Sequence, residues 1–582
     1  MLTLRKQPYS KGYLVYTFYI QYFYRGTKMI IYFSETLNIE KYDGIHLLQD
    51  HIGTNYKAPW DDFDYVITFQ VFHVATQNKK KLGNIKLLSK NSMNTSKLFK
   101  IQENLISDKI YNISSILNSN DFISIGEEID YYKRIKSIYN FPENEKYLEL
   151  ICDIGIHGGK IDEYVEWGGY YSSLMRGSSS TAILKKGFQI ALGQYIADKE
   201  FEITIDTLGE TFEPITFKFN KNRLIGESNI CLLIGKNGVG KSHVLKEISK
   251  LVTGLIPNTS SLPAFHKLII IAYSPFESFY CHNQIFNMLD ERFSNNGSKT
   301  NKKSDKRKRM HINEYSYIGF KNEDGLFDLN YPTKRSIESV LKIINYDQEN
   351  FWWKDEKTRF TILKETLKLC MDFDEFFILD KNNNEILISN EISLKTIKES
   401  AINYEAGLIF KKDNIKLSLS SGQIIYSYIL PAIMSEIEEE SLLILDEPEL
   451  YLHPELEVNL INMIKNILNE TNSYSIIATH SSIIAREVEK KAINILRKDK
   501  NITKIFKPSI ETYGESIENI ISEVFDDNYI KKPFQHEIDE YFKNPNFSLS
   551  DAKKIIGDDA LIHLLSKIKE DDDEVIIIEG EL

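Results

Sequence analysis

The stretch from Asn229 to Lys250, NICLLIGKNGVGKSHVLKEISK, constrains the fold of this chain more than any other. It joins an apolar, strand-like run, Ile230 to Ile234, to apolar residues repeated every three or four positions, as in a half-buried helix. An octet of the form G-x-x-x-x-G-K-S lies between them: Gly235, Lys236, Asn237, Gly238, Val239, Gly240, Lys241 and Ser242. A strand, this octet and a helix together predict a phosphate-binding loop.

Each part of the octet has a role toward phosphate. The glycines let successive backbone N–H groups converge, and the helix N-terminus adds the positive end of its dipole. Lys241 brings a mobile cation to the outer phosphates, the Ser242 hydroxyl can ligate Mg²⁺, and His243 follows in the first helical turn. A ligand-free, Gly-rich turn is the alternative. With every fixed position filled, we predict that Gly235 to His243 bind ATP together with Mg²⁺.

The composition fits a folded, cytoplasmic protein of two to four domains. The 582 residues are 42% hydrophobic and 26% charged, as in ordinary folded chains. A net charge of −12 argues against a general nucleic-acid coat protein but permits a local basic patch. Four widely spaced cysteines suggest neither zinc nor disulfides. No apolar run is long enough to cross a bilayer and no cleavable signal is recognisable, so no membrane contact is expected.

Residues 1–95 are predicted to be β-rich. Aromatic and β-branched residues fill Tyr13–Tyr24 and Met29–Phe33, which read as paired strands. A second hairpin is expected to join Tyr65–Ala75 to Asn84–Leu88 across the polar turn Thr76–Gly83. The chain is therefore expected to begin with a small sheet.

Residues 96–195 read as mostly helical, and 196–290 as the first half of a nucleotide domain. In the helical region, Arg176 to Ser180 (RGSSS) is either a helix cap, the commoner case, or a second anion site. In the nucleotide domain, two strands precede the phosphate loop, and Phe212 or Phe217 is a candidate to stack on adenine.

Glu277 follows an apolar strand that we expect beside the phosphate loop. Its carboxylate either contacts the metal or the attacking water, or is an ordinary loop acid. Residues 291–410 then read as an insertion with helices and a small hairpin. Within it, 302–309 (KKSDKRKR) is either a solvated loop or a contact to nucleic-acid phosphates.

Residues 411–507, the second half of the nucleotide domain, complete the candidate site. The sequence LSSGQ opens an apolar helix, and its predicted nucleotide contacts are Ser420, Gly422 and Gln423. An apolar strand ends in Asp446, placed to hold the Mg²⁺ hydration shell, and Glu447, placed to orient or deprotonate the attacking water. Another ends at His480, which is either structural or a donor to the γ-phosphate. We predict Glu447, His480 and Lys241 as catalytic residues.

In combination these motifs resemble the ATP-binding-cassette (ABC) ATPases. LSSGQ is similar to their signature, LILDEP to their Walker B strand and ATH to their switch histidine. The resemblance implies an α/β fold, with an ABC-type P-loop head of mixed sheet and flanking helices. It also implies a composite site, in which the signature of one chain closes over ATP held by another, and hence a homodimer or higher homo-oligomer.

The sequence ELYLHP after Glu447-Pro448 is similar to the soluble branch of chromosome-maintenance, recombination and overcoming-lysogenization-defect ATPases. Within it, LMRGSS, AYSPFESF, YIG and ATHSS resemble the ATPase subunit of Septu-type antiphage systems, PtuA, including retron-associated relatives. The family usually has Pro where this chain has Ser482. The resemblance implies an ATPase that controls a separate HNH nuclease subunit. The alternative is a DNA-repair or recombination ATPase that clamps DNA directly.

Residues 508–582 are expected to be helical and to end in a strand, Val575–Glu581. A strand ending in Glu579-Gly580 resembles the start of a toprim nuclease domain, but later metal-binding acids do not follow it in this sequence. We therefore expect no nuclease site in this chain.

Overall fold

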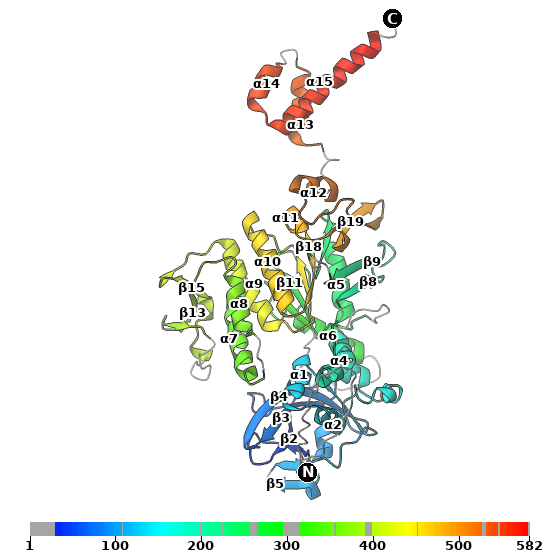
Figure 1. Cartoon of the computed structure of the whole chain (residues 1–582), viewed down its shortest axis with the longest axis vertical. Coiled ribbons are helices and arrows are strands. Elements are labelled where there is room, and N and C mark those ends of the chain that lie inside the picture. Colours follow the sequence, from blue (N-terminus) through cyan, green and yellow to red (C-terminus); the bar gives the residue numbers. More distant parts are fainter. Residues whose placement is uncertain are drawn as a thin grey trace, which may run out of the picture.

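The computed structural model describes most of the chain in two large units and a small C-terminal one (Figure 1). The described residues are 29–107, 109–197, 199–222, 225–226, 229–256, 265–294, 315–353, 357–389, 399–450, 452–525, 531–544 and 548–579. The predicted strand Tyr13–Tyr24 and the basic segment 302–309 lie outside them.

The N-terminal unit is a seven-stranded sheet in the order β5-β6-β1-β2-β3-β4-β7. Its strands are β1 (Ile31–Ser34), β2 (Gly44–Gln49), β3 (Thr68–Ala75), β4 (Asn78–Ser89), β5 (Leu105–Ser107), β6 (Ile110–Asn112) and β7 (Phe122–Gly126). Four helices follow: α1 (Ile129–Ile138), α2 (Glu143–Leu150), α3 (Ile161–Tyr164) and α4 (Gly177–Leu192). Apolar strand residues and buried tyrosines of the helices form the main core of this unit, and Trp352 of the head also packs against it.

The second predicted hairpin is present, but its turn is shorter than expected. Only Thr76 and Gln77 join β3 to β4, and their φ angles of 50° and 61° are left-handed, as in a two-residue hairpin turn. The lysines 79–81, expected in the turn, therefore pair with β3. Strands β5 to β7 also fall in the region expected to be mostly helical, because periodicity alone does not separate short apolar runs into helix and strand.

The head is built on a second seven-stranded sheet, in the order β12-β11-β17-β18-β10-β19-β20. Its strands are β10 (Ile230–Gly235), β11 (Leu268–Ala272), β12 (Tyr315–Gly319), β17 (Leu442–Asp446), β18 (Tyr474–Thr479), β19 (Ile493–Asp499) and β20 (Ile502–Phe506). Every neighbouring pair is parallel except β19 with β20. The continuous apolar runs of these strands fit a sheet buried on both faces.

Helices cover both faces of the head sheet, with α5 on one side of the strands and α9 and α10 on the other (Figure 1). The helices are α5 (Lys241–Val252), α6 (His282–Ser294), α7 (Tyr331–Asn350), α8 (Arg359–Leu367), α9 (Ser421–Glu436), α10 (Pro454–Glu470) and α11 (Ser482–Arg486). The remaining head strands are the hairpin β8 (Glu200–Ile205) and β9 (Ile215–Asn220), and a sheet of β13 (Glu375–Leu379), β14 (Glu385–Leu387), β15 (Ile409–Lys412) and β16 (Ile415–Lys416).

Two expectations about the head are corrected. The region 291–410 is not wholly an insertion, because its strand β12 forms the edge of the central sheet beside β11. Strand β11 is not next to β10, since β17 and β18 lie between them. Parallel strands are joined by long crossovers, so neighbours in sequence need not be neighbours in the sheet.

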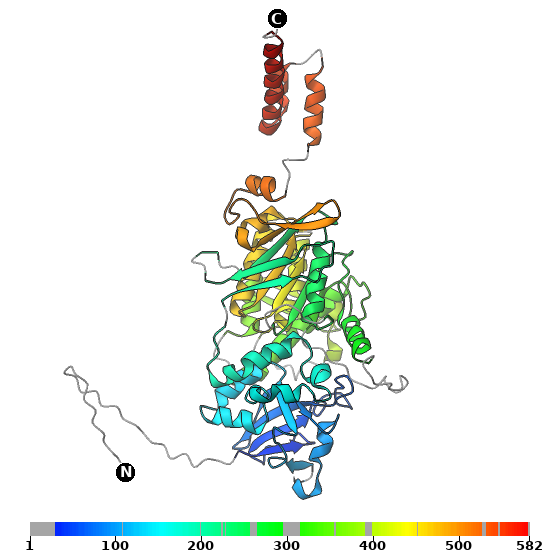
Figure 2. The ribbon, with the colours of Figure 1, turned by 90° about the vertical axis from the view of Figure 1, so that its right-hand side faces the viewer.

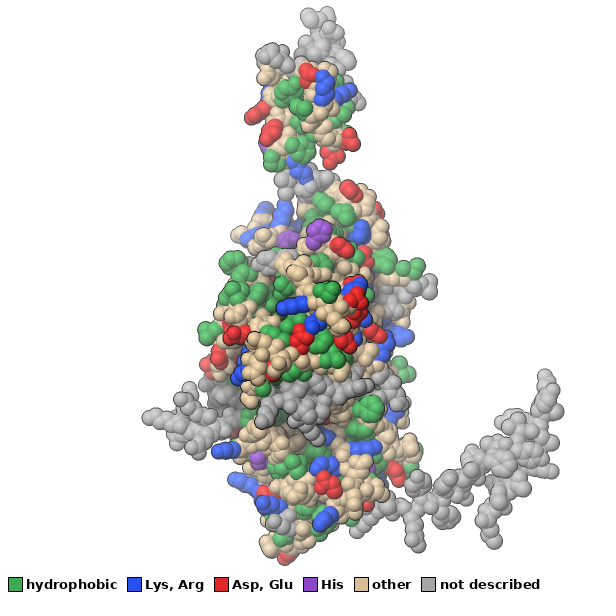
Figure 3. Space-filling model, turned by 90° about the vertical axis from the view of Figure 1, so that its left-hand side faces the viewer, with side chains coloured by type: hydrophobic (Ala, Val, Ile, Leu, Met, Phe, Trp, Pro, Cys, Tyr) green, Lys and Arg blue, Asp and Glu red, His purple; other side chains and the backbone are tan. Residues whose placement is uncertain are grey.

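The N-terminal unit packs against the head at the end opposite the C-terminal helices (Figure 2). Phe63 stacks on Phe286 of α6 with ring centroids 5.3 Å apart, and Lys186 of α4 pairs with the buried Glu440. On the face shown in Figure 3, acidic and basic side chains are mixed over both units.

The C-terminal part is helical: α12 (Ile517–Val524), α13 (Pro533–Phe542), α14 (Leu549–Ile555) and α15 (Asp558–Glu579). The final strand expected from Val575 onward is therefore wrong up to Glu579. Extending an existing helix satisfies each new N–H group locally, whereas an isolated strand has no partner for its hydrogen bonds. No helix in the described ranges is long and apolar enough to span a bilayer.

Candidate nucleotide site

The phosphate loop links the C-terminal end of β10 to the first turn of α5. Two of its glycines have left-handed backbones, with φ of +75° at Gly238 and +108° at Gly240. A Cβ at Gly240 would also lie 2.3 Å from the Phe212 ring, so both conformation and space require glycine there. The backbone therefore curls as the sequence predicts.

Lys241 is 6% exposed and points back over this loop. Its Nζ donates to the Gly235 carbonyl at 3.1 Å and lies 2.6 Å from Nε2 of His480. Oε1 of Glu447 is 3.6 Å from the same amine. Burial lowers the pKa of Lys241, while the charges of Glu447 and Asp446 act in the opposite direction. A buried ammonium group forms a stronger ion pair with a bound anion than a solvated one does, so Lys241 is suited to bind a phosphate.

His480 has two competing neighbours at one nitrogen. Its Nε2 lies 2.6 Å from the Lys241 amine and 3.3 Å from Oε1 of Glu447. An ammonium group only donates and a carboxylate only accepts, so Nε2 can accept from Lys241 or donate to Glu447, but not both. Displacement of the Lys241 amine toward a phosphate would leave His480 free to donate.

Asp446 and Ser242 form the part of the site that fits a divalent cation. The Ser242 hydroxyl donates to Oδ2 of Asp446 at 3.0 Å. The other oxygen, Oδ1, is buried and has no hydrogen-bond donor among the described residues. Burial raises the pKa of Asp446 to about 6. A hydroxyl beside an unsatisfied carboxylate oxygen suits Mg²⁺, which prefers oxygen ligands.

Glu447 is held in an unusual backbone conformation immediately after β17. Its φ is 49°, and its N–H donates to the Ala478 carbonyl at 2.9 Å, which ties it to β18. A hydrogen bond from His480, followed by the charge of Lys241, lowers the pKa of Glu447. A non-glycine residue in this region stores strain that the surrounding sheet maintains, and such strain is common at functional sites. Its carboxylate stays ionised and able to accept a proton.

Glu449 is a site residue that the sequence interpretation did not single out. Its Oε1 accepts from the Thr479 hydroxyl at 2.8 Å and from the His480 backbone N–H at 2.6 Å. Burial raises the pKa of Glu449, and in the described part of the chain its Oε2 has no hydrogen-bond donor. Glu449 therefore fixes the position of His480. The repeat of acids in E-P-E was the available sequence signal.

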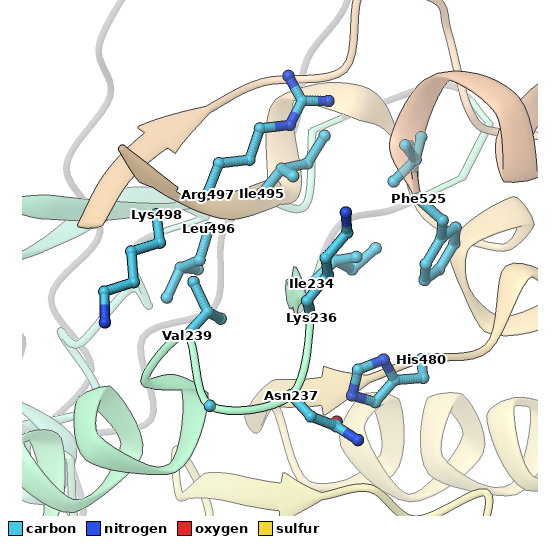
Figure 4. Close-up of a pocket in the computed structure, with 13 residues that line it drawn as sticks. Ile234, Lys236, Asn237, Val239, His480, Ile495, Leu496, Arg497, Lys498 and Phe525 are labelled. Carbon is cyan, nitrogen blue, oxygen red and sulfur yellow. The ribbon is translucent and has the colours of Figure 1, made fainter. Parts of the chain in front are cut away.

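A cavity of about 650 Å³ opens beside the phosphate loop (Figure 4). It lies between the ends of β10 and β19 and the last turn of α12. Its lining residues are Ile234, Gly235, Lys236, Asn237, Gly238, Val239, His480, Ile495, Leu496, Arg497, Lys498, Val524 and Phe525. The size is typical of a small-molecule site.

The signature residues lie at the start of α9 and bond within their own surroundings. Ser420 and Gln423 form a reciprocal capping box, and Nε2 of Gln423 donates to the Cys370 carbonyl at 3.0 Å. A Cβ at Gly422 would lie 2.5 Å from Leu456 of α10, so this helix start packs closely on its neighbour. None of the three predicted signature contacts lines the cavity.

Glu277 is not placed as a metal ligand. Oε1 accepts from the Tyr317 hydroxyl at 2.8 Å and pairs with Lys321 at 2.7 Å, and Oε2 accepts from the Phe279 N–H at 2.6 Å. Its side chain is 3% exposed. Both oxygens are thus engaged in holding β12 and the loop after β11, which corrects the metal expectation.

The structure also bears on the other open alternatives. Phe217 is fully buried in the head core and cannot stack on a ligand, whereas Phe212 lies against Gly240 with its ring 5.4 Å from that of His243. Arg176 is 4% exposed and pairs with Asp62 at 2.6 Å, a carboxylate that it shares with Lys86. The helix α4 begins directly after Arg176, and Ser180 of its first turn donates to the Arg176 carbonyl at 3.3 Å.

The sheet order, the phosphate loop, the acids at the end of β17 and the histidine after β18 define an ABC-type P-loop ATPase head. Three parallel strands bring Gly235, Asp446 and His480 to one edge of the sheet, and the strand of His480 lies between the other two. The predicted α/β fold with such a head is confirmed.

Comparisons with known proteins find one matching family and one sequence relative. Residues 300–486, which include Asp446, Glu447 and His480, match the family described as "AAA domain, putative AbiEii toxin, Type IV TA system". The chain is 22% identical over 490 residues to Protein ea59 of Escherichia phage lambda, which covers 80% of this chain and 84% of that protein.

Solved structures of two kinds are also similar. The ADP conformation of an ATP-binding cassette of an ABC transporter covers 54% of this chain and 91% of its own, at 14% identity and a TM-score of 0.25. The SMC head domain from Thermotoga maritima covers 54% of this chain and 100% of its own, at 11% identity and a TM-score of 0.27.

Proposed function

We propose that this chain is an ATP-binding and ATP-hydrolysing regulatory subunit of an antiphage defence system. It controls a separate nuclease, of the HNH type, through ATP-dependent association of its heads. The observation that carries the ATPase part is the meeting of Lys241, Glu447 and His480 within 3.6 Å of one another above the phosphate loop. Lys241 supplies a cation, Glu447 a base and His480 a hydrogen-bond donor, and the three groups lie next to one another.

Each of these residues has a role in hydrolysis. The loop N–H groups and Lys241 bind the phosphates, and Glu447, kept ionised by its neighbours, accepts a proton from the attacking water. Ser242 and Asp446 would hold Mg²⁺, which supplies positive charge against the phosphates when bound. His480, fixed by Glu449, donates to the outer phosphate once the Lys241 amine has turned to the nucleotide.

A nucleotide site shared between two chains would require the heads to associate. The signature at Ser420–Gln423 bonds to its own helix and to the Cys370 carbonyl after α8, and it does not line the cavity beside the phosphate loop. A second copy, packed head to tail, would present its signature to that loop and complete both sites by symmetry. We therefore propose a homodimer, or a higher oligomer built from such pairs.

The regulatory role in defence is supported by resemblance. The motif set resembles the PtuA subunit of Septu-type systems, and the matching family model carries the words "putative AbiEii toxin" in its description. The phage origin of one relative is consistent with a role in conflicts that involve phages.

A phage-plating assay tests this function. Cells that carry the chain with its flanking genes should resist phage, and Lys241→Ala or Glu447→Gln should abolish resistance. Glu455→Gln, the same chemical change at an exposed position on α10, is the matched control and should retain it. Full resistance with Lys241→Ala would refute a regulatory ATPase.

A further inference from the structure

The cavity beside the phosphate loop lies at the outer-phosphate end of the site. It is lined by the first five loop residues and by His480, the proposed donor to the outer phosphate. Phe212 and His243 lie where α5 begins, and Thr503, which bridges Phe212, donates to the carbonyl of the cavity residue Val239. Because His480 lines the cavity, the terminal phosphate of a nucleotide held on this loop would lie next to it.

The charge of the cavity suits an anion. Three cations, Lys236, Arg497 and Lys498, line it, and no carboxylate is found among the described residues of its lining. Lys236 is exposed and projects from the loop into the cavity, with Arg497 and Phe525 on the far side (Figure 4). Its amine can follow a phosphate that extends beyond the reach of Lys241.

The far wall of the cavity comes from the C-terminal part of the chain. Ile520 and Val524 of α12 are buried in the head core, and this anchors the helix. Val524 and the half-buried Phe525 then form the cavity wall. An exposed lysine gains little from an anion in water, but an apolar wall that excludes water strengthens the same contact.

We propose that this cavity makes the site selective for a nucleoside triphosphate over a diphosphate. Lys236 contacts the outermost phosphate, and Phe525 excludes water from that contact. Lys236 and Phe525 are thus specificity-determining residues. The end of α12 lies next to the outermost phosphate of a triphosphate, which a diphosphate lacks. This inference rests on the proposed nucleotide binding.

Calorimetric titration of the full chain with Mg²⁺ and either ADP or the non-hydrolysable β,γ-imido analogue of ATP tests the proposal. Lys236→Ala should weaken binding of the triphosphate analogue about tenfold, the loss of one charge-assisted contact, and leave ADP binding unchanged. Phe525→Ala should reduce the triphosphate preference several-fold. Phe525→Leu, which keeps an apolar wall, should retain most of it.

Two variants outside the cavity serve as controls. Lys491→Ala removes an exposed lysine and Phe534→Ala removes a phenylalanine that is 38% exposed, and both should keep the parent's preference. Unchanged ADP binding shows that each variant is folded. Equal weakening of both nucleotides by Lys236→Ala, or an unchanged preference in Lys236→Ala and Phe525→Ala, would overturn the proposal. A parent that binds neither nucleotide would instead refute the proposed function itself.

Discussion

Replacing Asp446 by Asn should change how the stability of the nucleotide-free chain depends on pH. Burial raises the pKa of Asp446 from 3.8 to about 6. A carboxyl group whose pKa is raised on folding stabilises the fold fully below its unfolded pKa, and this contribution is lost as pH rises through the folded value. The loss therefore occurs between about pH 4 and pH 6, and above this window it is constant.

The magnitude follows from the two pKa values. Relative to low pH, where Asp446 is protonated in both the folded and the unfolded state, its ionisation lowers the free energy of unfolding by about 1.6 kcal/mol at pH 5 and about 3 kcal/mol at pH 8. Asn at this position does not titrate, and any penalty for its buried amide is the same at both pH values. The stability difference between Asp446→Asn and the parent should thus shift by about 1.4 kcal/mol in favour of the variant from pH 5 to pH 8.

Urea unfolding without nucleotide, followed by circular dichroism at both pH values, measures this shift. Ser475→Ala, a buried polar change without a titrating group, is a suitable control and should show no such shift. If the difference in unfolding free energy between Asp446→Asn and the parent is the same at pH 5 and pH 8, burial does not raise the pKa of Asp446 in the nucleotide-free chain.

Three further predictions concern the loop, the positioning of His480 and the composite site. Gly240→Ala should weaken nucleotide binding at least about tenfold, because a new Cβ meets the Phe212 ring and φ is left-handed. Gly158→Ala, where a Cβ meets nothing within 4 Å, is the control and should bind as the parent does. Equal affinities of Gly240→Ala and the parent in a binding titration would contradict this prediction. Glu449→Ala should lower kcat more than it raises KM, and Glu449→Gln, which keeps an acceptor for the His480 N–H, should restore much of the loss; a change in KM alone would argue against a positioning role. Ser420→Arg and Lys241→Ala should each be inactive, yet their equimolar mixture should regain up to about a quarter of the parent's ATPase rate, since half the pairs are mixed and each holds one intact site. No recovery in the mixture would count against a composite site.

The sequence predicted the phosphate loop well because its chemistry is local. Lys241 and Ser242 follow a glycine turn that is recognisable from eight consecutive residues. Asp446 and His480 each end an apolar strand, and parallel strands place such ends at one edge, so their meeting also followed from pattern.

Residues whose partners are distant in sequence were harder to interpret. Glu277 looks like a metal ligand until Lys321 and Tyr317, about 40 residues later, are seen to engage it. Glu449 shows its role only through Thr479 and His480, across the sheet. In the C-terminal part, the β-branched run from Val575 favours a strand locally, yet α15 continues through it.

The central claim is that Glu447 is the base of an ATPase site built on the phosphate loop. The most direct measurement is ATP binding and ATP turnover by Glu447→Gln in the same preparation. The variant keeps the shape of the side chain but not its basicity, so it should bind ATP with the parent's affinity while kcat falls by roughly 100-fold or more. Near-normal turnover by Glu447→Gln would contradict the account.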